Sequence, residues 1–376
     1  MPQILNRLCS IAAALCLASP AISATYDLPP EGEDVIGSVS TVIATFDDTL
    51  VDLARRHGVG YEDIVRANPD VNVWVPGDGT EIVIPTRYVL PAGPRRGIVL
   101  NLAEYRLYYY PEAADGETPV VMTFPISIGR MDWETPLGNT SVVAKVVNPS
   151  WYPPQSIRDE HAADGDPLPR IVPPGPDNPL GKHAMRLGLP GYLIHGTNRP
   201  AGVGMRVTHG CLRMFPENIE ELFPLVDVKT PVRIVNEPVK MGWSGDTLVM
   251  EVHPVLESAP AKTVDEPVEP DAVVDTSAEA VEGEQESGEA VDAVLAETIE
   301  FAAPEKSPLT YVTEQFIVAT GERSGSLDWQ LVEDVVERAD GMPVTVGEGA
   351  PVVADDSEDG VEVSLVTPTA DSALYD

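Results

Sequence analysis

The sequence predicts a mainly β protein with some helix. It comprises a small β-α-α-β module at residues 40–86, a larger mainly β domain at residues 97–236, and a largely disordered acidic tail. Three observations predict this organisation. Two apolar strand patterns enclose two helical patterns in the module, strand patterns dominate the larger domain, and acidic residues dominate the last third of the chain.

Negative charge is concentrated towards the C-terminal end. The 376 residues include 24 Lys and Arg against 60 Asp and Glu, and the stretch from Glu251 onward holds 31 acidic and 4 basic residues. An excess of acid repels the phosphates of nucleic acids and of anionic membranes. We therefore expect neither of these as a partner.

The first 24 residues have the pattern of a signal peptide. Arg7 supplies a positive charge, residues 8–18 are apolar but too short to span a bilayer, and small residues precede a cleavage position after Ala24. The sequence therefore predicts an exported protein. A short N-terminal anchor is the alternative, and Leu15 before Cys16 does not suit a lipidation site.

Export changes the number of cysteines. Cys9 and Cys16 lie in the predicted signal peptide, so Cys211 is the single thiol of the expected mature chain. A lone thiol in an oxidising compartment is a liability unless it is used or well buried. Cys211 is therefore the first candidate for chemistry.

A linker is expected at residues 25–38, followed by the compact module. Its strands and helices are expected, in β-α-α-β order, at residues 42–44, 50–58, 61–67 and 82–84. Asp48 and Thr49 have side chains suited to capping the first helix, and Gly58 suits its end.

This module resembles a LysM domain. The resemblance is carried by Asp48-Thr49-Leu50, Leu53-Ala54, Gly58-Val59, Ala67-Asn68-Pro69 and Ile82-Val83-Ile84-Pro85. Asp47 departs from the pattern, because the family usually has Gly there. The resemblance implies binding to the N-acetylglucosamine-containing backbone of peptidoglycan or chitin. An unspecified small α+β domain is the alternative.

Strand patterns continue through the larger domain. We expect a hairpin from residues 98–102 and 106–110. Further strands are expected at residues 120–128, 141–147, 192–194 and 232–235, and a helix at residues 217–226. Residues 148–179 are rich in Pro, Asp and Gly and are expected to form a long loop. Its aromatic and cationic residues are candidates to line a cleft, namely Trp151, Tyr152, Arg158 and Arg170.

Beyond the larger domain the composition changes. Residues 257–304 have almost no aromatic side chains and are expected to form a disordered acidic linker. A short, partly helical segment is expected at residues 305–348, with one or two helices from the patterns at 309–320 and 327–339, before a disordered tail at 349–376. The acidic stretch is interpreted as a spacer or as a docking arm for a basic partner.

The chemistry-bearing residues lie in two short motifs. The first is His195-Gly196-Thr197, and after eleven intervening residues the second is His209-Gly210-Cys211-Leu212-Arg213. A thiol attacks an acyl carbon as its thiolate, so it needs a neighbour that takes or stabilises its proton, and two histidines supply that need. Arg213 adds positive potential and a planar fork for a carboxylate.

Other interpretations of this cysteine remain open on the residues alone. Cys211 with His195, His209 and one more ligand could bind zinc, although no Cys-x-x-Cys or His-x-x-x-His pair is present. A structural or redox-sensing cysteine is the third interpretation, but a glycine-rich turn between polar residues is a poor core position.

The two motifs resemble those of the L,D-transpeptidase catalytic domain, also called the YkuD domain. Further similar segments are Ile98-Val99-Leu100-Asn101-Leu102-Ala103-Glu104, Thr135-Pro136-Leu137-Gly138, Asn148-Pro149-Ser150-Trp151, Asn178-Pro179-Leu180-Gly181 and Asn236-Glu237-Pro238-Val239. The resemblance covers residues 97–253 and implies a mostly antiparallel, β-sandwich-like fold. Thr208 departs from the family pattern, which usually has Ser there, but keeps the hydroxyl.

The resemblance also implies roles for individual residues. Cys211 would be the nucleophile, His195 the general base that later acts as acid, and His209 a second active-site histidine. The oxyanion-binding or turn-shaping positions would be Gly196, Thr208 and Gly210, and the substrate-binding cation would be Arg213. No metal ion or organic cofactor is implied.

The implied reaction is cysteine acyl transfer on peptidoglycan tetrapeptide stems in the periplasm. It releases D-Ala and joins the diaminopimelate carbonyl to an amine, either another stem, giving a 3→3 cross-link, or a lysine of an outer-membrane lipoprotein. The resemblance also implies acylation of the cysteine by carbapenems. The alternatives are an L,D-carboxypeptidase, with water as acceptor, and a non-catalytic wall-binding protein that acts through LysM.

Overall fold

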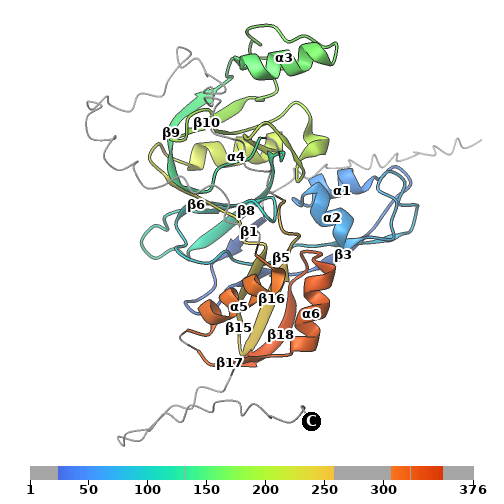
Figure 1. The fold of residues 1–376 in the computed structure, drawn as a ribbon, viewed down its shortest axis with the longest axis vertical. Coiled ribbons are helices and arrows are strands. Elements are labelled where there is room, and N and C mark those ends of the chain that lie inside the picture. Colours follow the sequence, from blue (N-terminus) through green and yellow to red (C-terminus); the bar gives the residue numbers. More distant parts are fainter. Residues whose placement is uncertain (1–23, 132, 258–305, 322, 350–376) are drawn as a thin grey trace, which may run out of the picture.

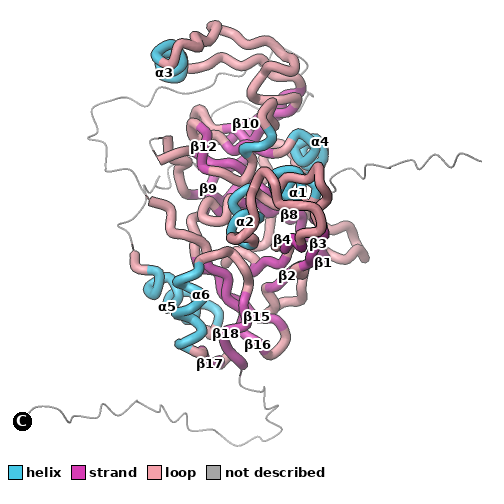
Figure 2. Tube along the Cα trace, turned by 90° about the vertical axis from the view of Figure 1, so that its right-hand side faces the viewer, coloured by secondary structure: helices cyan, strands magenta, loops and turns pink. Residues whose placement is uncertain are grey.

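The computed structural model describes residues 24–131, 133–257, 306–321 and 323–349. These residues form a β-α-α-β module, a β-barrel beside it, and a C-terminal unit (Figures 1 and 2). The predicted signal peptide lies outside the described residues except for Ala24, as do nearly all of the predicted acidic linker and tail. None of the helices in the described ranges has the length and apolar character needed to cross a bilayer.

The module contains the elements expected from the sequence. They are β3 (Ser40–Ile43), α1 (Leu50–Arg56), α2 (Tyr61–Ala67) and β4 (Glu81–Ile84), with β3 and β4 antiparallel. The Thr49 side chain caps α1 by accepting a hydrogen bond from the Asp52 backbone N–H at 3.0 Å. Leu50, Leu53 and Ile64 are fully buried between the helices and strands.

The linker predicted at residues 25–38 is wrong, because this segment contains two strands. β1 (Ala24–Asp27) pairs antiparallel with β8 (Val120–Gly129), and β2 (Val35–Gly37) pairs antiparallel with β5 (Arg87–Val89). Strands of three or four residues carry too little apolar alternation to be recognised. Pairing with longer strands far along the chain stabilises them.

The larger domain is a closed barrel. Eight strands follow one another around it in the order β8, β13, β11, β10, β9, β14, β6 and β7, and β7 pairs with β8 again. Besides β8 they are β6 (Gly97–Asn101), β7 (Arg106–Tyr110), β9 (Gly138–Val147), β10 (His183–Leu187), β11 (Leu193–His195), β13 (Leu212–Met214) and β14 (Pro231–Val235). The mainly β prediction is confirmed, but the sandwich-like arrangement becomes one sheet closed on itself.

Apolar side chains fill the barrel. Phe124, Ile194 and Leu212 belong to its buried cluster, and helix α4 (Pro216–Leu225) adds Ile219 and Leu222. Most neighbouring strands are antiparallel, whereas β14–β6 and β11–β13 are parallel. The parallel β11–β13 pair requires a long crossover between the two strands, which carries the short helix Pro200–Gly202 and β12 (Arg206–Thr208).

The long loop predicted before β10 contains a helix, α3 (Gln155–Ala163). The prediction of an irregular loop over residues 148–179 is therefore wrong in part. Pro and Gly on both sides obscured a helix of nine residues with a low apolar content. α3 stands at one end of the molecule in both views (Figures 1 and 2).

The catalytic-domain boundary predicted at residue 236 is followed by a second sheet. Its strands are β15 (Val239–Ser244), β16 (Thr247–Val252), β18 (Val344–Gly349) and β17 (Gly325–Leu327), in that order. Helices α5 (Pro308–Ala319) and α6 (Trp329–Arg338) pack on it through Val312, Val332 and Val335. The helices expected in this segment are present, but they belong to a unit that begins before the acidic stretch.

The module docks on the barrel through the crossover and α4. Arg55 makes two hydrogen bonds to the Glu217 carboxylate, at 2.7 and 2.8 Å. The Tyr61 backbone N–H donates to the Val203 carbonyl at 3.0 Å. Gly204 has φ +86°, and a Cβ there would lie 2.4 Å from the Gly60 Cα, so only glycine permits this approach.

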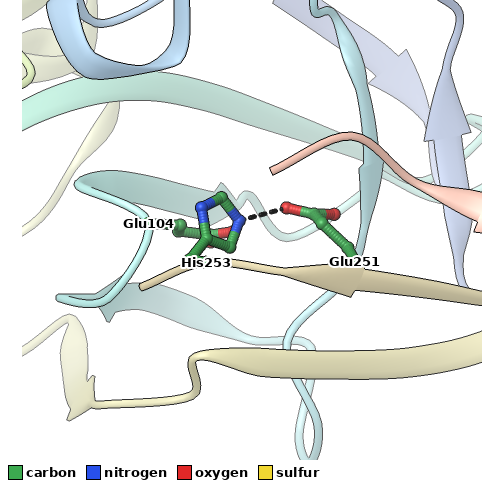
Figure 3. A group of neighbouring side chains, drawn as sticks. All are labelled: Glu104, Glu251 and His253. Carbon is green, nitrogen blue, oxygen red and sulfur yellow. Dashed lines mark hydrogen bonds and ion pairs between the residues drawn. The ribbon is translucent and has the colours of Figure 1, made fainter. Parts of the chain in front are cut away.

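A buried ionic cluster joins the barrel to the C-terminal unit. Figure 3 shows Glu104, from the turn after β6, beside Glu251 and His253 at the end of β16. The Lys240 ammonium lies between the carboxylates, 2.9 Å from Glu251 Oε1 and in direct contact with Glu104, and it donates to the Val89 carbonyl at 2.7 Å. The four side chains of the cluster are almost completely buried.

The cluster holds two carboxylates with different environments. Burial raises the pKa of Glu104. Burial also disfavours the charged form of Glu251, but Lys240, His253 and the Val89 N–H outweigh it and lower the pKa of that carboxyl. A cation at position 240 is therefore required for the cluster to be buried at neutral pH.

Replacing Lys240 with Met should leave buried carboxylates without their cation. We expect a loss of roughly 3–5 kcal/mol in the free energy of unfolding near pH 7. The loss should shrink at lower pH, because protonation of Glu104 removes one uncompensated charge. Urea unfolding at two pH values measures both effects.

Lys182→Met is the matched control, since Lys182 pairs with Glu220 at 2.8 Å on the surface. It should change stability little. A similarly small change for Lys240→Met would contradict the account of this cluster.

Candidate active site

Cys211 occupies a tight turn between β12 and β13. Gly210 has φ +98°, which favours glycine, and a Cβ there would also crowd the Tyr192 ring at 3.0 Å. Two hydroxyls hold the turn: Thr208 Oγ1 donates to the Cys211 carbonyl at 2.6 Å, and Thr135 Oγ1 donates to the Gly210 carbonyl at 2.8 Å. The thiol is therefore presented by a backbone that is fixed on both sides.

Parallel pairing of β11 with β13 sets the neighbours of the thiol. Ile194 is opposite Leu212, and both side chains point into the barrel core. Because side chains alternate along a strand, His195, Cys211 and Arg213 lie on the opposite face. The Cys211 thiol also lies 3.5 Å from the Gly191 carbonyl, and it packs against a small buried cluster that includes Leu193.

The His195 ring is buried and neutral. Burial, followed by the positive charge of Arg213, lowers its pKa to about 3, although backbone hydrogen bonds with Gly196 and Leu180 favour the charged form. The Gly196 carbonyl, which can only accept, lies 2.7 Å from Nδ1 and so places a proton there. The unprotonated Nε2 can accept a proton, and a thiolate formed near the ring would raise this low pKa.

His209 has a more exposed setting. Its Nε2 lies 3.0 Å from Glu160 Oε2, and its ring makes an edge contact with Trp133, with 5.3 Å between centroids. Burial lowers the pKa of His209, while the hydrogen bond to Glu160 raises it in part. Arg130 holds the other Glu160 oxygen at 2.8 Å.

Arg213 has an unsatisfied donor. Its side chain is mostly buried, which lowers its pKa, and no described residue accepts a hydrogen bond from its Nε. A buried, unpaired guanidinium donor costs free energy unless a ligand supplies the acceptor. The role of Arg213 as a substrate-side cation stays a prediction.

The zinc interpretation gains no support from the geometry. Within the described ranges, the residues whose ligand atoms lie close enough to share an ion are Glu104, Glu251 and His253, and the Lys240 ammonium already lies among them. The two active-site histidines and Cys211 do not form such a group.

Comparisons with known proteins show the family of the chain. The model of the YkuD L,D-transpeptidase catalytic domain matches residues 95–234. The probable L,D-transpeptidase YcfS of Escherichia coli K12 is 42% identical over 254 residues, which cover 66% of this chain and 78% of that protein. The probable L,D-transpeptidase ErfK/SrfK of Salmonella typhimurium is 35% identical over 337 residues, or 88% and 94% of the two chains.

The chain belongs to the L,D-transpeptidase family. A solved L,D-transpeptidase from Mycobacterium smegmatis overlaps 42% of this chain and 63% of its own at 21% identity, with a TM-score of 0.29. That overlap is too small to add to the relationship seen in sequence.

In this L,D-transpeptidase the motif residues identified from sequence gather around one turn. The structure brings His195, Thr208, Gly210, Cys211 and Arg213 together, and Gly196 follows His195. Of the residues predicted to line a cleft, Trp151 packs in the small cluster with Cys211. Arg158 instead hydrogen-bonds to Gln155 within α3, and Arg170 is exposed.

Four further residues of the transpeptidase site were not predicted. They are Arg130, Trp133, Thr135 and Glu160. Thr135 lay in a segment similar to the family, which was a usable signal. Glu160 and Arg130 gave none, because their partnership with His209 depends on how α3 folds back over the barrel.

Substitutions at Thr208 test the hydroxyl that holds the catalytic turn. Thr208→Ser keeps the donor to the Cys211 carbonyl and should retain most transpeptidase activity. Thr208→Val keeps the shape but loses the hydrogen bond, which leaves a buried carbonyl unpaired, and should reduce the turnover rate roughly 5- to 100-fold. Steady-state kinetics of both variants would decide, and equal activities would contradict the role of the hydroxyl.

Proposed function

We propose that this protein performs two-step acyl transfer on peptidoglycan tetrapeptide stems, with Cys211 as nucleophile. The proposal rests on the pairing of β11 with β13, which sets His195 opposite Arg213, with Cys211 directly before β13. A thiol on the same face as a neutral imidazole and a guanidinium is suited to attack on an acyl group that carries a carboxylate.

In the first step, His195 Nε2 takes the thiol proton and the thiolate attacks the carbonyl of the L-centre of diaminopimelate. The backbone N–H groups of Gly210 and Cys211 are candidates to bind the resulting oxyanion. Collapse of this tetrahedral intermediate breaks the carbon–nitrogen bond to D-Ala and leaves a thioester on Cys211. His195 returns the proton to the leaving amine. Arg213 is suited to hold a carboxylate of the stem.

In the second step, an amine attacks the thioester and frees the thiol. The acceptor is a second diaminopimelate side chain, which gives a 3→3 cross-link, or a lysine of an outer-membrane lipoprotein. Water in place of the amine would give an L,D-carboxypeptidase. Both acceptors belong to the periplasm, which agrees with the signal peptide predicted at residues 1–24. None of these steps needs a metal ion or an organic cofactor.

Incubation with disaccharide-tetrapeptide tests this reaction. The protein should release D-Ala and form a 3→3 dimer, and Cys211→Ala should do neither, because no thioester can form. Mass spectrometry of the products and of the intact protein follows both steps. Release of D-Ala without a dimer would favour water or a protein acceptor, whereas no release and no acyl-enzyme mass would contradict the proposed function and favour the wall-binding alternative.

We infer that the β-α-α-β module binds the glycan strand. Its two neighbouring loops expose apolar side chains: Phe46 is 85% exposed, Trp74 63% and Val75 70%. Backbone hydrogen bonds tie the loops together, from Leu50 N to Val73 O and from Gly79 N to Ala44 O. Exposed aromatic rings that the backbone holds in place are suited to stack on the apolar faces of sugar rings.

The double substitution Phe46→Ala with Trp74→Ala should weaken binding to purified peptidoglycan, because it removes the stacking surfaces. We expect a loss of roughly tenfold or more in affinity in a sedimentation assay. Trp329→Ala is the matched control, since Trp329 is an exposed tryptophan on helix α6 of the C-terminal unit. Equal losses in both variants would contradict a glycan site on the module.

A further inference from the structure

Helix α3 reaches the catalytic turn through one carboxylate. Glu160 Oε1 lies 2.8 Å from Arg130 Nη2, and Glu160 Oε2 lies 3.0 Å from His209 Nε2. Arg130 follows β8, and its backbone N–H donates to the Thr208 carbonyl at 2.9 Å. Glu160 therefore connects α3 with the segment after β8, through Arg130, and with the Cys211 turn, through His209.

The carboxylate determines where His209 carries its proton. Burial raises the pKa of Glu160, but hydrogen bonds from Arg130 and His209 outweigh it and lower that pKa, so the group is ionised. An ionised carboxylate can only accept, and therefore Nε2 carries the proton that is donated to Glu160. The neutral ring is left with an unprotonated Nδ1, and the Trp133 edge contact restricts its rotation.

The segment that carries α3 is fastened at its base. Trp151 and Val172 exchange two backbone hydrogen bonds, at 2.9 and 2.8 Å. The buried Asn178 amide donates to the Pro149 carbonyl at 2.8 Å, and its oxygen accepts from the Leu180 N–H at 2.9 Å. The two ends of this segment are therefore fixed near Cys211. The position of α3 between them depends on the contacts of the helix itself, which include the ion pairs of Glu160 with Arg130 and His209.

We propose that Glu160 is a positioning residue that acts through His209: it holds the imidazole in one orientation and one tautomer beside Cys211 when α3 is seated. The proposal rests on the proposed acyl transfer at Cys211, and adds that α3 is needed for a competent site. Glu160 itself does not touch the reacting atoms.

The groups that face His209 determine in which direction its pKa changes when Glu160 is replaced. They are Glu160 and His161 from α3, Arg130 and Trp133 from the segment after β8, and the surrounding buried atoms. Burial, Arg130 and His161 lower the pKa of His209, and Glu160 raises it. Removing the Glu160 charge should therefore lower the pKa of His209 further.

Three variants test this. Glu160→Gln removes the charge with little change in shape, Glu160→Asp keeps the charge on a shorter arm, and Asp159→Asn is the matched control. Asp159 is an exposed carboxylate on the same helix, and it accepts a hydrogen bond from Gln155. Two measurements apply to each: NMR titration of the histidine rings, with His209 assigned by substitution, and kinetics of D-Ala release.

We expect Glu160→Gln to lower the pKa of His209 and to reduce kcat roughly 10- to 100-fold, with KM nearly unchanged. Glu160→Asp should recover part of both losses, and Asp159→Asn should match the wild type. If Glu160→Gln behaves like Asp159→Asn, or if it lowers kcat without changing the His209 titration, the positioning role is overturned. If the wild type itself releases no D-Ala, the proposed function fails, while the titration still reports on the contact between Glu160 and His209.

Discussion

The rest of the site depends on the parallel pairing of β11 with β13. Antiparallel neighbours can be joined by a two-residue turn, but parallel neighbours need a crossover, and here that crossover runs from Gly196 to Cys211. It carries the turn that presents the thiol. The register of the pair then puts His195 opposite Arg213, on the face where Cys211 emerges. The arrangement of these three residues thus follows from the pairing of two neighbouring strands in the barrel wall.

The same crossover is supported from two directions. The β-α-α-β module contacts it at Val203 and Gly204, where two glycine backbones meet, and α3 contacts its end at His209. A proposed glycan-binding surface and the proposed reaction centre are therefore connected through one stretch of backbone. The buried Lys240 cluster attaches the C-terminal unit to the barrel.

The sequence predicted the local features well and the long-range ones poorly. The hairpin of β6 and β7, the helix α4 and the cysteine turn follow from short patterns and from motif residues that lie within eighteen positions of each other. The barrel pairs β13–β8, β14–β9 and β14–β6, the short strands β1 and β2, and the C-terminal sheet depend on partners far apart in the chain. The sheet was missed because its strands lie on both sides of the acidic stretch.

The same distinction holds at the active site. Cys211, His195 and Arg213 are recognisable because their residue types and spacing reflect the chemistry. Glu160 is one acid among many in an acidic chain, and only the fold of α3 singles it out. A side chain such as Glu160, which orients a reactive group, belongs to no recognisable motif. It can be found only once the helix that carries it is known.

Reaction with a carbapenem tests the central claim, that the turn at Gly210 presents an activated thiol, most directly. Peptide mapping by mass spectrometry after brief incubation should find one acyl adduct, on Cys211, because the lactam carbonyl reacts with the thiolate as a stem carbonyl would. A protein that remains unmodified, or that is acylated elsewhere while Cys211 stays free, would contradict the account.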